Sequence, residues 1–166
     1  IPDTALVAFT DGSAIPNPGP CGAGFSIWRG ASIVAEGTYA LGEGTNNIGE
    51  FSAIGLVSRQ IVASPTLLLD TPAVYVLSDS KLAVDGVLGQ SWIKSLEDLV
   101  QLAAGYFNDL SALVPTRLIW IPGHVQTDGN DRADVRAKEG AVASAGAPAC
   151  HLALLDAAFH TPRTPL

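Results

Sequence analysis

The sequence predicts one α/β domain built on a mixed sheet. Short apolar runs bounded by glycine, proline and polar residues are typical of buried strands, and longer stretches with helical periodicity lie between them. Two of the runs are separated only by the turn Arg29-Gly30, which indicates an antiparallel hairpin. The order strands, helix, strand, helices, strand, helix is that of an α/β layer fold with a mixed sheet.

The composition fits a single soluble domain and excludes several other classes. The chain has 166 residues, of which 48% are hydrophobic, and no apolar run approaches the roughly 20 residues of a membrane span. We therefore expect one domain over residues 1–146, a proline-rich tail or linker over 147–166, and no membrane partner. The two cysteines are too few for a disulfide framework, so we expect an intracellular, reducing compartment. The sequence has no methionine and begins Ile-Pro, which favours excision from a larger protein.

The first predicted strand, residues 6–9, is followed closely by the carboxylate of Asp11. An unpaired carboxylate at an apolar strand costs several kcal/mol unless a partner or a metal ion compensates it. Asp11 either caps the turn Gly12-Ser13 or belongs to a functional site. The second interpretation requires other carboxylates to converge on the same place. Residues 14–20 then form a loop rich in proline and glycine.

The next elements are a hairpin and a helix. Residues 22–28 and 32–41 are the two hairpin strands, and Gly42-Glu43-Gly44 ends the pattern. Thr45-Asn46-Asn47 supplies N-caps for a helix whose apolar face carries Glu50 one turn before Ala53 and Ile54. Gly49 inside this helix costs roughly 1 kcal/mol relative to alanine, so we expect a loose helix start.

The second half repeats the theme of a strand that ends in a carboxylate. After a linker over 64–72, residues 73–77 form a buried strand followed by Ser78-Asp79-Ser80, much as the first strand is followed by Asp11. The remaining predicted elements are helices over 82–88, 96–113 and 130–145 and a strand over 117–121.

Acidic residues therefore stand at the ends of several elements. If the strands before Asp11 and Asp79 are parallel neighbours, both side chains emerge at one edge of the sheet, and a packed helix could bring Glu50 beside them. Either Asp131 or Asp134 could join from the last helix. Such like charges repel strongly, and Mg²⁺ or Mn²⁺ is the natural counterion for an all-oxygen site. Two such ions about 4 Å apart or less serve hydrolysis of phosphodiesters.

Four blocks of sequence resemble the type 1 ribonuclease H family, in the same order and at similar spacing. They cover residues 5 to about 143, and the most similar branch is the ribonuclease H domain of reverse transcriptases and retroelements. The blocks are Phe9-Thr10-Asp11-Gly12-Ser13 with Asn17-Pro18-Gly19, Thr45-Asn46-Asn47-Ile48-Gly49-Glu50, Ser78-Asp79-Ser80, and Gly123-His124 with Gly129-Asn130-Asp131-Arg132-Ala133-Asp134. The resemblance implies a three-layer fold with a five-stranded mixed sheet flanked by helices.

The resemblance also implies roles for individual residues. The metal ligands would be Asp11, Glu50, Asp79 and Asp134, which hold two Mg²⁺ ions that Mn²⁺ can replace. His124 would assist proton movement and product release; the alternative is a surface histidine that caps a turn. The residues implied to contact the RNA/DNA hybrid could each be a cap or turn residue instead; they are Gly12, Ser13, Asn17, Thr45, Asn46 and Ser80.

Several hypotheses on function follow. The first is an endoribonuclease that hydrolyses the RNA strand of RNA/DNA hybrids, as a domain of a larger reverse-transcriptase or retroelement polyprotein. The alternatives are a catalytically retired fold that serves as a docking module, and a Holliday-junction resolvase or strand-transfer enzyme of the same fold. The net charge of −7 and the single Lys94 among the acidic residues of 85–115, where some members carry a basic handle, predict weak hybrid binding by the isolated domain.

Overall fold

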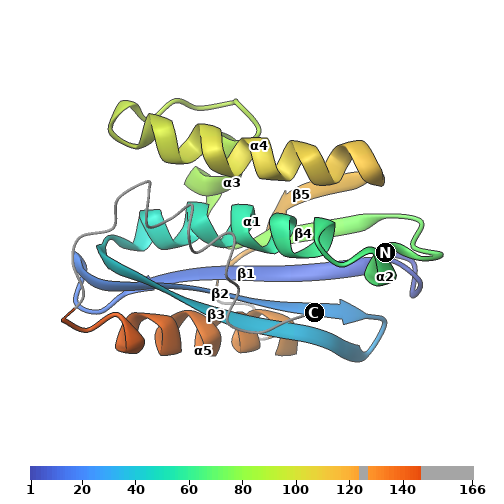
Figure 1. The fold of residues 1–166 in the computed structure, drawn as a ribbon, viewed down its shortest axis with the longest axis horizontal. Helices are drawn as coiled ribbons and strands as arrows, with labels where there is room; N and C mark the ends of the chain where they lie inside the picture. The colour runs from blue at the N-terminus through green and yellow to red at the C-terminus, as the bar shows by residue number, and fades with distance from the viewer. Residues whose placement is uncertain (124–126, 147–166) are drawn as a thin grey trace.

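The computed structural model of the chain describes residues 1–123 and 127–146. The predicted α/β class is confirmed: five strands form one mixed sheet with helices on both faces (Figure 1). The elements are β1 (Leu6–Ala14), β2 (Gly19–Arg29), β3 (Ser32–Gly44), α1 (Asn46–Val62), α2 (Pro65–Leu68), β4 (Val74–Ser78), α3 (Lys81–Val87), a 3₁₀ turn η1 (Lys94–Leu96), α4 (Glu97–Leu113), β5 (Thr116–Trp120) and α5 (Asp128–Ala143).

The sheet has the order β3-β2-β1-β4-β5. β1 pairs antiparallel with β2 and parallel with β4, and β4 pairs parallel with β5. The strands that precede Asp11 and Asp79 are therefore parallel neighbours, as the argument from the sequence required. The parallel pairing of β1 with β4 reaches Thr10 and Ser78, one residue before each carboxylate.

Several predicted boundaries differ from the structure, among them the start of β2, which is Gly19 and not residue 22. β1 does not end near Phe9 but continues to Ala14, because residues 11–14 still pair with 21–24 of β2. β3 likewise continues through Gly42-Glu43-Gly44, which we expected to end it, because these residues pair with residues 19–21 of β2. The expected linker 64–72 contains the short helix α2, with Pro65 at its first position, where the missing N–H costs nothing. The expected tail, residues 147–166, lies outside the described residues.

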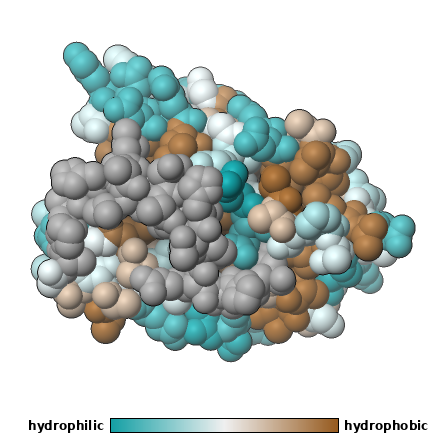
Figure 2. All heavy atoms as spheres, in the orientation of Figure 1, coloured by the Kyte–Doolittle hydropathy of each residue, from teal (hydrophilic) through white to brown (hydrophobic). Residues whose placement is uncertain are grey.

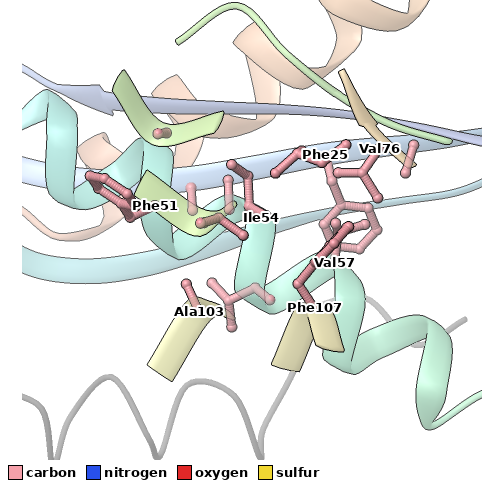
Figure 3. Packing of buried hydrophobic residues seen from close by; sticks show 14 of the residues in the cluster. Phe25, Phe51, Ile54, Val57, Val76, Ala103 and Phe107 are labelled. Atoms are coloured by element: carbon pink, nitrogen blue, oxygen red, sulfur yellow. The ribbon is translucent and has the colours of Figure 1, made fainter. Parts of the chain in front are cut away.

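The core lies between the sheet and α1, and α1 lies between the sheet and α4 (Figure 1). The predicted apolar positions Ala53, Ile54, Val57 and Ile61 are all at most 1% exposed. The helix is buried almost all round, so its second face, which includes Phe51, also packs in the core. Figure 3 shows Phe51, Ile54 and Val57 of α1 among side chains from the sheet and from α4.

Helix α5 covers the opposite face of the sheet and approaches it through small residues. A Cβ at Gly22 or Gly24 of β2 would overlap the backbone of α5, and Ala133, Ala137 and Ala141 on the facing side of α5 are fully buried. Because small side chains line both sides of this contact, α5 packs close to the sheet.

The surface combines polar residues with scattered apolar ones, as the teal and brown areas of Figure 2 show. None of the helices in the described part of the chain is long and apolar enough to cross a membrane.

Candidate active site

Three carboxylates from three elements meet beside the ends of β1 and β4. Asp11 comes from β1, Glu50 from the first turns of α1, and Asp79 from the residue after β4. One oxygen from each lies within 4.8 Å of the others. The structure thus brings together three of the four predicted metal ligands. Asp11 is not a turn cap, because it lies inside the paired strand.

Burial governs the charge state of this carboxylate cluster, which we define as Asp11, Glu50 and Asp79. Burial raises the pKa of Asp11 to about 7, and the negative charges of Asp79 and Asp134 add to that rise against a lowering contribution from the hydrogen bond with Glu50. Burial, followed by the charge of Asp11, also raises the pKa of Glu50 well above its usual value. Without a counterion, the cluster therefore holds protons at neutral pH.

The donor set fits a divalent cation. All three residues offer carboxylate oxygens, and Glu50 Oε2 is buried without a hydrogen-bond partner in the described part of the chain. A buried acceptor with no donor costs free energy unless a ligand occupies it. Hard cations such as Mg²⁺ and Mn²⁺ bind such oxygen sets.

Asp134 stands beside the cluster, whereas Asp131 does not. Asp134 on α5 raises the pKa of Asp11, and its Oδ2 lies 2.9 Å from Nζ of Lys138, one helical turn further along. Asp131 is exposed in the first turn of the same helix and has no effect on the pKa of Asp11. Asp134 thus interacts with the cluster, and its role as a metal ligand stays a prediction. His124 lies outside the described residues.

The start of α1 is tight rather than loose, so the expectation drawn from Gly49 is wrong. A side chain at Gly49 would meet the carbonyl oxygen of Gly22 at 2.7 Å and Cα of Gly12 at 2.9 Å, and a Cβ on Gly12 would overlap the backbone of Gly49 and Glu50. Two glycines thus let α1 touch β1, which places Glu50 beside Asp11. The cost of Gly49 within the helix is offset by this tertiary contact, which helix propensity does not describe.

The predicted substrate contacts serve as structural residues in the protein alone. The hydroxyls of Thr45 and Ser80 accept the N-capping hydrogen bonds of α1 and α3, from Ile48 N and Ala83 N. Ser13 is buried in β1 beside Gly49.

Asn17 and Asn46 join the loop after β1 to α1. Asn17 Oδ1 accepts from Asn46 N at 3.0 Å, and Asn46 Oδ1 accepts from Ala14 N at 2.7 Å. These bonds occupy the amide oxygens and leave both exposed NH₂ groups as the donors that a ligand would meet.

Sequence reasoning missed the contacts around Asp79. Trp120 at the end of β5 donates its indole N–H to the carbonyl oxygen of Asp79 at 3.1 Å, and Gly123 lies beside the Asp79 carboxylate. An aromatic residue just before Pro-Gly-His was the available signal, but its partner depends on the pairing of β4 with β5.

Comparison with known proteins agrees with this fold. The family model described as RNase H matches residues 3–142. The chain therefore belongs to the ribonuclease H family. Its structural neighbours include structures named RNase H1 at 27% identity.

Three relatives illustrate the similarity. A ribonuclease H of Verminephrobacter eiseniae is 32% identical over 139 residues, which is 80% of this chain and 87% of that protein. The crystal structure of LC11-RNase H1, isolated from compost by a metagenomic approach, in complex with an RNA/DNA hybrid superposes with a TM-score of 0.58 at 27% identity, covering 81% of this chain and 94% of that one. The bifunctional protein Rv2228c of Mycobacterium tuberculosis is 33% identical over 58% of this chain, and the match spans only 26% of its own length.

Proposed function

We propose that this chain is an endoribonuclease that hydrolyses the RNA strand of RNA/DNA hybrids at the carboxylate cluster and Asp134, with Mg²⁺ as its cofactor. The observation that carries the proposal is the convergence of Asp11, Glu50 and Asp79, whose oxygens lie within 4.8 Å of one another. The LC11 relative in complex with a hybrid and the Verminephrobacter ribonuclease H support the choice of substrate.

The residues divide the work as follows. Asp11, Glu50, Asp79 and Asp134 would hold two divalent cations, of which Mn²⁺ could replace Mg²⁺, and Glu50 Oε2 is the buried oxygen that lacks another partner among the described residues. When bound, such a pair of ions activates the attacking water and stabilises the leaving oxygen in phosphodiester hydrolysis. The carboxylates supply negative charge that the cations neutralise, and the tight contact of α1 with β1 keeps Glu50 oriented.

The surface near the cluster suits recognition of RNA. The exposed NH₂ groups of Asn17 and Asn46 are donors for ribose 2′-hydroxyls, which distinguish RNA from DNA in a minor-groove mode. Gly12, Ser13, Thr45 and Ser80 remain proposed contacts, and His124 remains a proposed aid to proton transfer.

We also propose that the chain acts as one domain of a larger protein. The mycobacterial relative is described as bifunctional, and this chain matches about a quarter of it. A retroelement polyprotein is the parent that the sequence favoured.

A cleavage assay tests the proposal directly. We expect Mg²⁺-dependent cleavage of the RNA strand in an RNA/DNA hybrid, and none of RNA/RNA or DNA/DNA duplexes of the same sequence. A retired docking module would cleave nothing, and a resolvase or strand-transfer enzyme would act on DNA. The buried carboxylates argue against retirement, because an unused cluster of like charges only destabilises the fold.

A further inference from the structure

Asp79 is the one member of the carboxylate cluster that lies outside a helix or strand. Asp11 is inside β1 and Glu50 is inside α1, whereas Asp79 is the single residue between Ser78, the end of β4, and Ser80, the N-cap of α3. The sheet ladder stops at the same point, where Ile121 N donates to Ser78 O at 2.9 Å. Something beyond regular structure must therefore hold Asp79.

Beyond the end of the ladder, the side chain of Trp120 links β5 to the segment that follows β4. Trp120 pairs with Ser78 in the register of β4 and β5, and its Nε1 donates to the carbonyl oxygen of Asp79 at 3.1 Å. The side chain is 46% exposed, so burial in the core does not account for its position. Its specific polar contact is to the backbone of Asp79.

Gly123, three residues after Trp120, lies close to the Asp79 carboxylate. A Cβ on Gly123 would lie 3.2 Å from Asp79 Oδ2, closer than an ordinary contact. The segment after β5 thus runs directly beside the carboxylate, while the indole holds the backbone that carries it. The indole therefore anchors the backbone of Asp79, and the chain at Gly123 leaves little room on one side of its carboxylate.

We propose that Trp120 is a positioning residue that sets the cation affinity of the carboxylate cluster by holding Asp79 through its carbonyl oxygen. The inference rests on the proposed function, because it requires that the cluster binds divalent cations. Hydrogen bonds that orient ligand residues typically change metal affinity or activity by about 10- to 100-fold when they are removed.

Both variants in the test remove the indole hydrogen bond, and one of them also keeps the size of the ring. The variants are Trp120→Phe and a protein in which position 120 carries a tryptophan analogue with sulfur in place of the ring N–H. The matched control is Trp28→Phe, which also loses an indole hydrogen bond, to Ser26 Oγ at 2.9 Å, but at the far end of β1, where Trp28 pairs with Val7. We expect the Mg²⁺ concentration for half-maximal hybrid cleavage to rise roughly tenfold for both changes at Trp120. Cleavage at saturating Mg²⁺ should stay within about twofold of the parent, and the control should keep the parent's Mg²⁺ requirement.

A second readout does not depend on activity. In ¹⁵N–¹H spectra, the indole signal of Trp120 should move on addition of Mg²⁺ and lose this response in Asp79→Asn, while the signal of Trp28 stays in place. If Trp120→Phe fails to fold, the test of the positioning role rests on the sulfur analogue, because this analogue keeps the size of the ring. Both this inference and the proposed function fall if the parent neither cleaves hybrid nor responds to Mg²⁺. Only the positioning role falls if the parent responds but the Trp120 signal does not move, or if the analogue keeps the parent's Mg²⁺ requirement.

Discussion

Asp11 lies inside a paired strand, and this placement decides its chemistry. It is 7% exposed, pairs with Gly24 of β2 and accepts from Gly12 N at 2.9 Å. An ionised carboxylate in such a place needs opposite charge, which the neighbouring Glu50 and Asp79 cannot provide. Under the proposed function, Asp11 serves ion binding at the expense of the stability of the metal-free fold.

Replacing a cluster aspartate by asparagine should reduce catalysis without reducing stability. Asp11→Asn and Asp79→Asn should each lower hybrid cleavage by orders of magnitude, because each removes a carboxylate ligand. Both proteins should melt at or above the parent's temperature in EDTA, since one repelling charge is gone. A marked drop in the metal-free melting temperature of Asp79→Asn would show that this carboxylate is structural.

The stability of the metal-free protein should fall as pH rises. The pKa of Asp11 is about 7 in the fold and 3.8 ordinarily, so between these values the folded state binds more protons than the unfolded state. The contribution is fully present below about pH 4 and is lost as pH rises through 7, at about 1.4 kcal/mol for each pKa unit. Melting temperatures in EDTA from pH 5 to 8 should show this fall, and Asp11→Asn should flatten it. Saturating Mg²⁺ should reverse the trend, because it binds the ionised form.

Asp134 and Asp131 provide a matched pair on one helix. Asp134→Ala should abolish or strongly reduce cleavage, since Asp134 stands beside Asp11, and Asp131→Ala should leave cleavage near the parent level. The opposite pattern would mean that the last sequence block is misaligned with the family. Rates with a common hybrid and circular dichroism of both variants provide the comparison.

At the scale of elements, the contact of α1 with β1 depends on the absence of two side chains. Gly12 and Gly49 face each other across this contact, and either Cβ would strike backbone atoms. Backbone cannot move aside as a flexible side chain can, so a substitution must shift the helix. Because Glu50 follows Gly49 directly, such a shift moves a proposed metal ligand.

Two alanine substitutions test this contact. Gly49→Ala should lower the free energy of unfolding by about 1–3 kcal/mol, as overpacking does, and should reduce cleavage. Gly105→Ala is the control, because Gly105 is exposed on α4 with open space around its Cβ position. It should be neutral or stabilising by up to about 1 kcal/mol. Equal effects of both substitutions in denaturant melts would contradict the role given to the contact.

At the scale of the whole molecule, four basic side chains that lie close in sequence to Asp79 or Asp134 are already paired. Lys81 lies 2.9 Å from Asp85, Lys138 pairs with Asp134, and Arg132 and Arg136 both pair with Glu36 of β3. With a net charge of −7, the domain offers phosphate groups little positive charge that is not engaged.

We therefore expect weak hybrid binding with a shallow dependence on salt. Each phosphate contact made by lysine or arginine contributes a slope of about −0.9 in log affinity against log salt for duplex DNA. Affinity measured at several salt concentrations should give a small slope for this domain, and attachment of a basic domain should raise both slope and cleavage. Tight, steeply salt-dependent binding by the domain alone would show that these ion pairs open readily and expose a basic face.

The sequence predicted the site better than the packing that holds it. Asp11 and Asp79 could be placed because parallel strands bring their ends to one edge. The N-cap Thr45 was one of three adjacent candidates, because capping is local. The tight packing at Gly49 could not be predicted, because helix propensity is a local property and does not include the contact of α1 with β1. The hydrogen bond from Trp120 to Asp79 was equally hidden, because it joins two segments whose register only the folded sheet defines.

The packing of α5 on its own face of the sheet affects how the proposed site would open by local unfolding. Three carboxylates belong to β1, α1 and the end of β4, but Asp134 belongs to α5, which packs on the other face against β1, β2 and β3. Local unfolding follows cooperative units, and one such unit would be α5, opening while the α1 face stays packed. A transient excursion of the last helix would then leave a three-ligand pocket, so that one cation escapes while its neighbour stays. The same molecule would hold its two ions with different residence times, set by two different unfolding events.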